Sequence, residues 1–381
     1  MNKMNIIIAV LLFAATIAGV LFIQWDSLTG KGDREPVFSD KFSLKELAKK
    51  NGIPPGELRF KLSHELPLGR KIPMKKPIKK LDIEQTKIIK ALEHALESDN
   101  PFTFIIKYVL WAVLAGVVVL LILQRKKIRL TRKIIMVLVV AIFGIWLGAT
   151  PSPMESIVKL SKCFAGMQGG PTAIAISFVL FSLFSLWGAK LICSWGCQLG
   201  ALQETLFNIP LFRKKYKFQI PFCLSLGVRL ILFIVFFVLL FNIGVSIKNF
   251  VVYHHVNYFK IYHFDDLTKV ALYSLPVFVI ASFFVFRPFC QFVCPFGLWA
   301  WILESLAINK IKIDQDKCIH CNKCVESCPT QAMKGIYQDK RKFFLPDCWS
   351  CGNCIEACPT DAISYGGKTE LKKSETKGQE K

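Results

Sequence analysis

The sequence is short of acidic residues and lacks two motifs of common cofactor-binding proteins. Its 381 residues include 27 Asp and Glu against 49 Lys and Arg, which gives a formal net charge of +22. No G-x-G-x-x-G run follows a strand and opens a helix, so nothing indicates a dinucleotide-binding fold. No C-x-x-C-H run is present either, which excludes covalent attachment of a c-type haem.

The apolar residues are not spread as a soluble fold would spread them. They make up 53% of the chain and gather in runs of 17 or more. About 20 apolar residues in a helix cross the hydrocarbon core of a bilayer. This pattern excludes a simple soluble enzyme, a disordered basic tail and a low-complexity or collagen-like chain. The six predicted membrane spans are Asn5–Ile23, Thr103–Leu123, Ile134–Thr150, Ala173–Cys193, Phe222–Ile247 and Val270–Phe286.

Basic residues in the short loops predict the orientation of these spans. Arg125–Lys133 holds six of them and Arg213–Lys217 holds four, whereas Pro151–Pro171 and Lys248–Lys269 are poorer in Lys and Arg. By the positive-inside rule, the two basic loops and both termini lie in the cytoplasm. The positive charge then anchors loops against anionic lipid and gives no evidence for nucleic-acid binding.

The predicted domain organisation has five parts. Residues 25–101 read as an external helical module, with a helix over Ser43–Gly52 and further helices over Gly56–Leu62 and Asp82–Leu96. The helix-turn-helix pattern could indicate DNA binding, but two-helix units have many uses, so we expect a packing or docking module. The other parts are a first span or signal anchor (1–24), a membrane domain (102–310), a cluster-binding domain (311–365) and a charged tail (366–381).

The cysteines carry the strongest signal in the chain. Eight of the 14 lie in two runs near the C-terminus, each with the spacing C-x2-C-x2-C-x3-C-P. In this spacing three thiolates bind one [4Fe-4S] cluster and the fourth cysteine reaches across to the other cluster. The predicted ligands are Cys318, Cys321, Cys324 and Cys358 for one cluster, and Cys348, Cys351, Cys354 and Cys328 for the other.

A structural zinc site is the alternative interpretation of these runs. Tetrahedral zinc takes four ligands, commonly as two separated pairs, and two consecutive four-cysteine runs that each end in proline fit it poorly. The thiols also need a reducing compartment, which agrees with a cytoplasmic domain. Trp349 and Ile319 lie inside the runs, and we expect them to shield the clusters from water.

A second cysteine pattern lies at the predicted cytoplasmic ends of the fourth and sixth spans. Lys190–Gly200 and Arg287–Gly297 each contain a basic residue, a C-x3-C pair and a closing glycine at matching positions. On one continuous helix this spacing places both thiols of a pair on one face. The pairs could bind a third metal centre or form a dithiol relay, and the alternative is that they are packing residues. Because the repeat matches in more than its cysteines, we expect convergence at the cytoplasmic boundary of the membrane. The four residues are Cys193, Cys197, Cys290 and Cys294.

With several spans, paired C-x3-C motifs and a two-cluster domain, the chain from about Pro101 to Tyr365 resembles the NapH/NosR-type membrane ferredoxins. The resemblance implies a membrane α-helical bundle with a C-terminal α+β domain that binds two [4Fe-4S] clusters. It also implies a multi-pass protein of the cell membrane that oxidises quinol, or exchanges electrons with the quinone pool, and feeds a respiratory reductase or its maturation. Membrane lipid, quinone and a redox partner protein are the expected partners.

Two departures limit what the resemblance carries over. Gln198 stands where the first motif would have proline, so only the second motif is a full C-x3-C-P. The segment before the membrane domain is too small for the flavin-binding domain of NosR, so a covalent flavin is not expected. A second class of function stays open, namely a cluster-bearing regulator or cofactor-assembly factor without quinol turnover.

Several single residues are weaker candidates. Three histidines follow the fifth span and could ligate haem or assist quinol deprotonation, with a solvated loop as the default expectation. Arg229 is expected to snorkel to the cytoplasmic face, or else to stabilise a nearby anionic cluster or quinone. Cys163 and Cys223 are single cysteines and are expected to pack. The histidines are His254, His255 and His263.

Overall fold

The computed structural model describes most of the chain between residues 37 and 366. The predicted first span, the charged tail and His263 lie outside the described residues. The described residues are 37–53, 55, 58, 59, 62, 66, 72–81, 83–96, 101–124, 128–148, 151–167, 171–209, 218–243, 251–262, 269–338 and 347–366.

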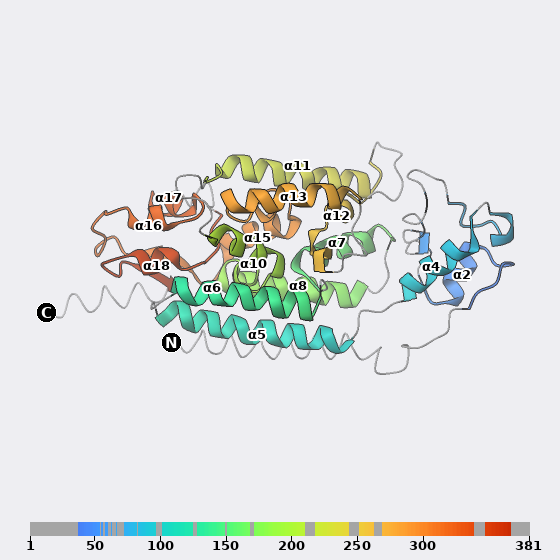
Figure 1. Cartoon of the computed structure of the whole chain (residues 1–381), viewed down its shortest axis with the longest axis horizontal. Coiled ribbons are helices and arrows are strands. Elements are labelled where there is room, and N and C mark those ends of the chain that lie inside the picture. The colour runs from blue at the N-terminus through green and yellow to red at the C-terminus, as the bar shows by residue number, and fades with distance from the viewer. Residues whose placement is uncertain are drawn as a thin grey trace.

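A small helical module lies at one end of the elongated molecule, a helical bundle in the middle and the cysteine-rich domain at the other end (Figure 1). In the module, helix α2 (Leu44–Lys50) begins at Ser43, which forms a capping box with Glu46. The short 3-10 helix η1 (Ile78–Lys80) and helix α4 (Gln85–Leu96) follow. The predicted first helix and its N-cap are therefore confirmed, and the third begins three residues later than predicted.

Among the described residues, two helices of the bundle are long and apolar enough to cross a membrane. These two are α5 (Pro101–Gln124) and α11 (Phe222–Leu240), and shorter apolar stretches lie in α8 (Pro171–Gly188) and α13 (Lys269–Phe284). Helix α6 (Ile128–Val139) runs directly into the π-helix η2 (Val140–Trp146).

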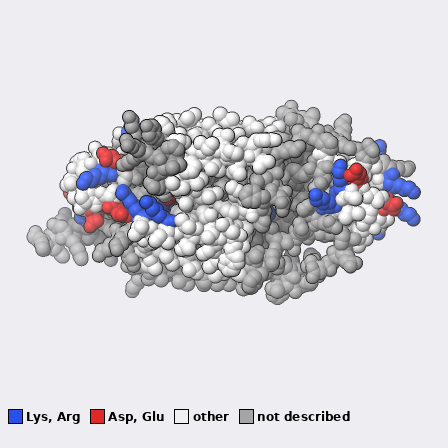
Figure 2. Space-filling view, in the orientation of Figure 1, with Lys and Arg blue, Asp and Glu red and all other residues white. Residues whose placement is uncertain are grey.

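The outward faces of these helices are apolar. They expose large hydrophobic side chains such as Val117 on α5, Ile134 on α6, Ile231 on α11 and Val277 on α13. Over the described surface in Figure 2, charged residues gather toward the two ends of the molecule and are sparse between them. An apolar belt of this extent fits a membrane environment better than water.

The connection between α5 and α6 differs from the prediction. Helix α6 begins at Ile128, six residues before the predicted start of the third span, so Arg132 lies on the helix and not in a basic loop. Its guanidinium is buried and donates to Glu204 at 2.5 and 2.9 Å. Arg132 therefore joins two helices instead of meeting lipid headgroups, because a buried cation needs a charged partner.

The two predicted outside loops contain helices. Helix α7 (Pro153–Phe164) is capped by Ser152 and contacts α8. The other loop holds α12 (Val252–His255) and the 3-10 helix η4 (Tyr258–Tyr262). The Tyr262 ring packs so closely on Gly144 of η2 that a Cβ there would lie 2.4 Å from a ring carbon. This loop therefore folds back into the bundle.

The cysteine-rich domain is a small α+β unit, as predicted. Its strands β1 (Lys310–Ile313) and β2 (Ile363–Gly366) pair antiparallel, with Lys310 opposite Gly366. Between the strands, the described residues form three short helices. They are α16 (Lys323–Ser327), α17 (Ala332–Tyr337) and α18 (Asn353–Ala357).

Candidate metal centres

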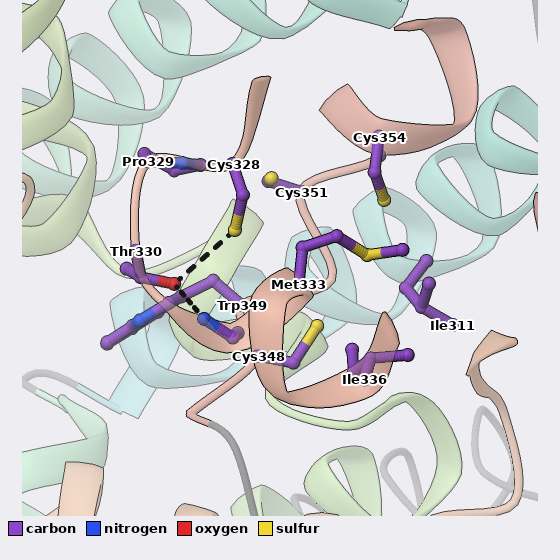
Figure 3. A pocket seen from close by; sticks show the side chains of 12 residues that line it. Ile311, Cys328, Pro329, Thr330, Met333, Ile336, Cys348, Trp349, Cys351 and Cys354 are labelled. Carbon is purple, nitrogen blue, oxygen red and sulfur yellow. Dashed lines mark hydrogen bonds between the residues drawn. The ribbon is translucent and has the colours of Figure 1, made fainter. Parts of the chain in front are cut away.

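The eight C-terminal cysteines surround two cavities of similar size. The inner cavity, of about 350 Å³, faces the bundle, and the outer cavity, of about 320 Å³, lies farther out in the domain. Each combines three cysteines of one run with the last cysteine of the other run, which is the grouping that the spacing predicts. Figure 3 shows the sulfur atoms of the four cysteines at the inner cavity. The inner set is Cys328, Cys348, Cys351 and Cys354, and the outer set is Cys318, Cys321, Cys324 and Cys358.

The two cysteine runs wrap their cavities with the same backbone geometry. In the first run His320 and Asn322 have positive φ angles of 56° and 58°, and in the second run Ser350 and Gly352 have 45° and 80°. These are matching positions, two and four residues after the first cysteine. A left-handed conformation costs a non-glycine residue roughly 1–2 kcal/mol, so the surrounding packing must hold it. Each run then enters its short helix, α16 or α18.

The chemistry of the two sets fits a multinuclear iron-sulfur cluster. Burial and neighbouring thiols raise the pKa of Cys354 well above its usual value. Burial also opposes ionisation of Cys358, but hydrogen bonds led by those from Thr360 hold its pKa below the usual value. Among the described residues, no three Cys, His, Asp or Glu side chains lie close enough together to hold one metal ion. Four thiols spread around a larger core fit a cluster, in which each ligand binds a different iron.

The surroundings of the two sets differ. Trp349 is buried against the inner cavity, as the sequence predicts. Ile319 lines the outer cavity and is 62% exposed, so it lies between that cavity and solvent. The surroundings differ because the inner run packs against the bundle, where the Cys348 N–H donates to Glu304 at 3.1 Å, whereas the outer run faces solvent.

The paired C-x3-C motifs do not lie on continuous helices. Helix α8 ends at Gly188, and the chain re-enters the bundle through α9 (Leu191–Trp195) and returns as α10 (Gln198–Asn208). The second motif repeats this with α14 (Pro288–Phe292) and α15 (Pro295–Leu306). The prediction of one helical face per pair is therefore wrong, because the helix breaks between the two cysteines. Cys197 and Cys294 are instead the N-cap residues of α10 and α15.

The two motifs nevertheless lie side by side. The Arg287 guanidinium of the second motif donates to the carbonyl oxygens of Cys193 and Ser194 in the first, each at 2.6 Å. The Gln203 side chain, on the helix that follows the first motif, approaches the Cys290 sulfur at 3.6 Å. The sulfurs of Cys197 and Cys294 each accept backbone N–H groups from the residues two and three positions later. Both therefore lie at the positive ends of helices, where anions are stabilised.

The closing glycine of each motif is required by a close backbone approach. A Cβ on Gly200 would lie 3.2 Å from the carbonyl oxygen of Cys193, and one on Gly297 would lie 2.9 Å from that of Cys290. Larger residues would push α10 or α15 away from the preceding half-helix. The repeat seen in the sequence is therefore a repeat in space.

The cysteine pairs lie deeper than the sequence predicts. The Trp111 indole of α5 donates to the carbonyl of Gly196 at 2.8 Å, so this turn lies beside the middle of α5. Ile122, 11 residues further along α5, approaches Gly352 in the cysteine-rich domain. At the helical rise, this separation is about 16 Å. The pairs therefore lie inside the bundle and not at the end of the spans.

Buried charges surround this turn region and connect it to the cysteine-rich domain. Lys190 forms ion pairs with Asp347 and, at 3.6 Å, with Glu304. Arg287, at the matching position of the second motif, pairs with Glu204 at 2.6 Å. Arg229 donates to Asp347 at 3.0 Å and is almost fully buried, so the prediction that it snorkels to the membrane surface is wrong.

Sequence reasoning missed the three carboxylates of this network, Glu204, Glu304 and Asp347. The sequence did indicate buried ion pairs, because an ionisable residue within an apolar helix costs free energy unless it has a charged partner. Glu204 and Glu304 lie on such helices, but their partners come from segments distant in sequence. The ion pairs of these carboxylates therefore could not be predicted from the sequence.

The remaining candidates are placed as follows. Cys163 is half-buried on α7, and Cys223 is exposed on α11, contrary to the expectation that it packs. The His254 and His255 rings lie edge to face at 6.0 Å in α12, inside the loop that folds back into the bundle. Burial lowers the pKa of His255.

Comparison with known proteins matches the two cysteine patterns separately. The family described as 4Fe-4S dicluster domain matches residues 310–359, and the family described as 4Fe-4S binding domain matches residues 170–219 and 269–307. The second match covers both re-entrant motifs. The chain is therefore an iron-sulfur protein. Its cysteine-rich domain and its bundle each match an iron-sulfur family.

Three relatives indicate which iron-sulfur proteins this chain is similar to. The chain is 29% identical over 183 residues to the putative electron transport protein YccM of Escherichia coli (strain K12), which covers 46% of this chain and 51% of YccM. It is 22% identical over 201 residues to the ferredoxin-type protein NapH of the same organism (49% and 67%). It is 26% identical over 155 residues to the regulatory protein NosR of Pseudomonas aeruginosa (39% and 21%).

The chain is similar to NapH/NosR-type ferredoxins over its bundle and its cysteine-rich domain. Several of these relatives are described as electron transport or ferredoxin-type proteins, and two helices of the described residues are long and apolar enough to cross a membrane. The match to YccM spans about half the length of that protein. No solved structure gives a significant match.

Proposed function

We propose that the chain is a membrane electron carrier that exchanges electrons between the quinol pool and a redox partner protein. The observation that carries the proposal is the crossed grouping of the eight C-terminal cysteines around two cavities. Each cavity takes one [4Fe-4S] cluster, bound by the inner or the outer cysteine set. The clusters supply one-electron transfer, while the protein binds them and sets their exposure to water.

The four re-entrant cysteines form a third redox centre on the membrane side of the inner cluster. The excess of buried positive charge in the protein supports a bound anionic centre at these cysteines. The buried charged side chains of the described residues comprise five cations and three carboxylates. Buried charge in excess is costly, and a metal centre held by four thiolates carries the compensating negative charge. The five cations are Lys107, Arg132, Lys190, Arg229 and Arg287.

An unfilled hydrogen bond points to the same place. Within the described part of the chain, the hydroxyl of the buried Tyr253 has no hydrogen-bond partner. This tyrosine lies in α12, within electrostatic range of Cys294. Buried hydroxyls are nearly always bonded, and a sulfur atom of a bound centre is a suitable acceptor.

In the membrane, we place the cysteine-rich domain in the cytoplasm and the module of residues 25–101 outside, with six spans in all. The basic connections before α6 and after α10 support this orientation. A reporter fused at the C-terminus should read as cytoplasmic and one inserted near Gly69 as external. An external C-terminus would show that a span has been miscounted.

The decisive experiment is metal analysis of the anaerobically purified full chain with electron paramagnetic resonance. The cysteine-rich domain alone should contribute about eight iron atoms per chain, in two reducible clusters. Zinc in place of iron, with no reducible signal, would end the electron-carrier proposal.

A second experiment tests the re-entrant cysteines. Cys290→Ser should leave both cluster signals of the cysteine-rich domain intact and abolish their reduction by a soluble quinol such as duroquinol. Cys223→Ser, on the exposed face of α11, is the matched control and should be reduced like the unmodified protein. Equal quinol-driven reduction in Cys290→Ser would assign the four thiols to packing.

One relative favours a second candidate function, because NosR is described as a regulatory protein. A cluster-bearing regulator or cofactor-assembly factor needs no turnover with quinol. The two functions differ in the rate at which bound quinol reduces the clusters. A rate that supports continuous turnover favours the electron carrier, and a single slow reduction favours the regulator.

A further inference from the structure

We propose that electrons pass between the re-entrant cysteines and the inner cluster through Trp195. The inference rests on the proposed function, in which both of these sites hold redox centres. It adds the residue that connects them and the half of the repeat that carries the connection.

Trp195 lies between Cys193 and Cys197 in the first motif and is almost fully buried. Its indole Nε1–H donates to the carbonyl oxygen of Ser350 at 3.1 Å. Ser350 immediately precedes Cys351, an inner-set cysteine. A single hydrogen bond thus joins a residue inside the C-x3-C motif to the loop that wraps the inner cavity.

This contact is held from both sides. The Arg132 guanidinium stacks over the Trp195 ring at 4.2 Å and donates to the Ser194 carbonyl at 3.1 Å. On the other side, the Ser350 hydroxyl donates to the carbonyl of Ala189 at 2.8 Å. The indole and its acceptor are therefore fixed relative to one another, and a fixed short contact is what electron tunnelling requires.

The second motif lacks this contact. Phe292 occupies the position that corresponds to Trp195, and a phenyl ring has no N–H to donate. Where the structure describes the chain, Arg287 of the second motif and the preceding Phe286 approach the inner run through ring contacts, with the Arg287 guanidinium 5.3 Å and the Phe286 ring 6.2 Å from the Trp349 ring. The repeat is therefore symmetric around the four thiols but asymmetric toward the inner cluster.

The proposed step moves one electron and no atoms. When quinol drives it, the reduced centre at the re-entrant cysteines is oxidised by one electron and the inner cluster is reduced by one. Trp195 provides the path and is itself neither oxidised nor reduced. The two protons of quinol oxidation leave before this step.

The test uses the full chain in detergent or liposomes and follows cluster reduction by duroquinol in a rapid-mixing experiment. Trp195→Phe introduces the residue that the other repeat carries and keeps a ring under Arg132. We expect the reduction rate of the inner cluster to fall about tenfold, because the hydrogen-bonded path through the indole is lost. Phe292→Leu, at the matching position, is the control and should keep the unmodified rate.

Iron content, midpoint potentials and direct reduction by dithionite separate a lost path from a damaged fold. All three should be unchanged in Trp195→Phe. A variant with unchanged quinol-driven rate, or one slowed equally by dithionite, would overturn the role of Trp195. An unmodified protein that duroquinol cannot reduce would instead overturn the proposed function, and this inference with it.

Discussion

The inner and outer cysteine sets use the same spacing and surround cavities of similar size, yet their surroundings have little in common. The inner run is tied to the bundle by the Trp195–Ser350 and Glu304–Cys348 hydrogen bonds. The outer run exposes Cys321 and Ile319. A cluster in the inner cavity is therefore insulated and fixed, whereas one in the outer cavity reaches the surface where a partner protein can approach.

In the proposed function, the same cysteine spacing serves the two ends of one electron path. The ligands come from the local spacing in both runs, and the role of each cluster comes from what packs against it. On this proposal, low exposure and buried charge around the inner set would tune the potential of its cluster, while exposure of the outer set would permit exchange with another protein.

The largest expected effect comes from removing one cysteine of each set. Cys354→Ala should lose the inner cluster, about half of the domain's iron, and with it all quinol-driven reduction of the outer cluster. Cys321→Ala should lose a similar amount of iron but leave the inner cluster reducible by quinol. Metal analysis and paramagnetic resonance measure both. Equal quinol reactivity of the remaining cluster in the two variants would remove the distinction between inner and outer.

Loss of the buried carboxylate next to the inner run should be the next largest effect. Asp347→Asn leaves Lys190 and Arg229 without this anionic partner, and breaking a buried pair costs about 3–5 kcal/mol. Asp316→Asn, exposed beside the outer run, should change stability by less than about 0.5 kcal/mol. Thermal unfolding in detergent, followed by tryptophan fluorescence, compares the two. Similar unfolding temperatures would show that the inner network does not hold the domain.

Backbone geometry offers a smaller and closely matched comparison. Gly352 has φ of 80°, and a Cβ there would lie 2.9 Å from Ile128 of α6, so Gly352→Ala should destabilise docking by about 1–2 kcal/mol. Asn322 occupies the matching place in the outer run, and Asn322→Gly should be neutral because glycine adopts this conformation freely. Limited proteolysis of the connection between the cysteine-rich domain and the bundle measures this difference. Equal resistance to the protease in the two variants would contradict the close contact between Gly352 and α6.

The smallest effect is expected at the exposed rim of the outer cavity. His320 shares a 2.7 Å hydrogen bond with the Tyr337 hydroxyl, and His320→Phe should cost about 1 kcal/mol or less. Both cluster signals should persist, and the midpoint potential of the inner cluster should stay the same. A shift of the inner potential would mean that the two sets are coupled more closely than their separate surroundings indicate.

The sequence alone predicted the grouping of the eight cysteines that the two cavities show, and the class of protein. The spacing C-x2-C-x2-C-x3-C-P restricts three thiols to one cavity over a few residues, and the crossing of the fourth follows from the repeat. The Ser43 cap and the apolar runs of α5 and α11 were readable for the same reason, because caps and helical length depend on neighbours in sequence.

Only the tertiary structure decided where the second cysteine pattern lies and what surrounds it. A C-x3-C spacing fits a continuous helix as well as two half-helices, and the break depends on long-range contacts such as Trp111–Gly196. The pairing of Arg229 with Asp347 joins residues 118 positions apart. Local pattern cannot distinguish a snorkelling arginine from a buried one, because the deciding energy comes from a partner that only folding brings near.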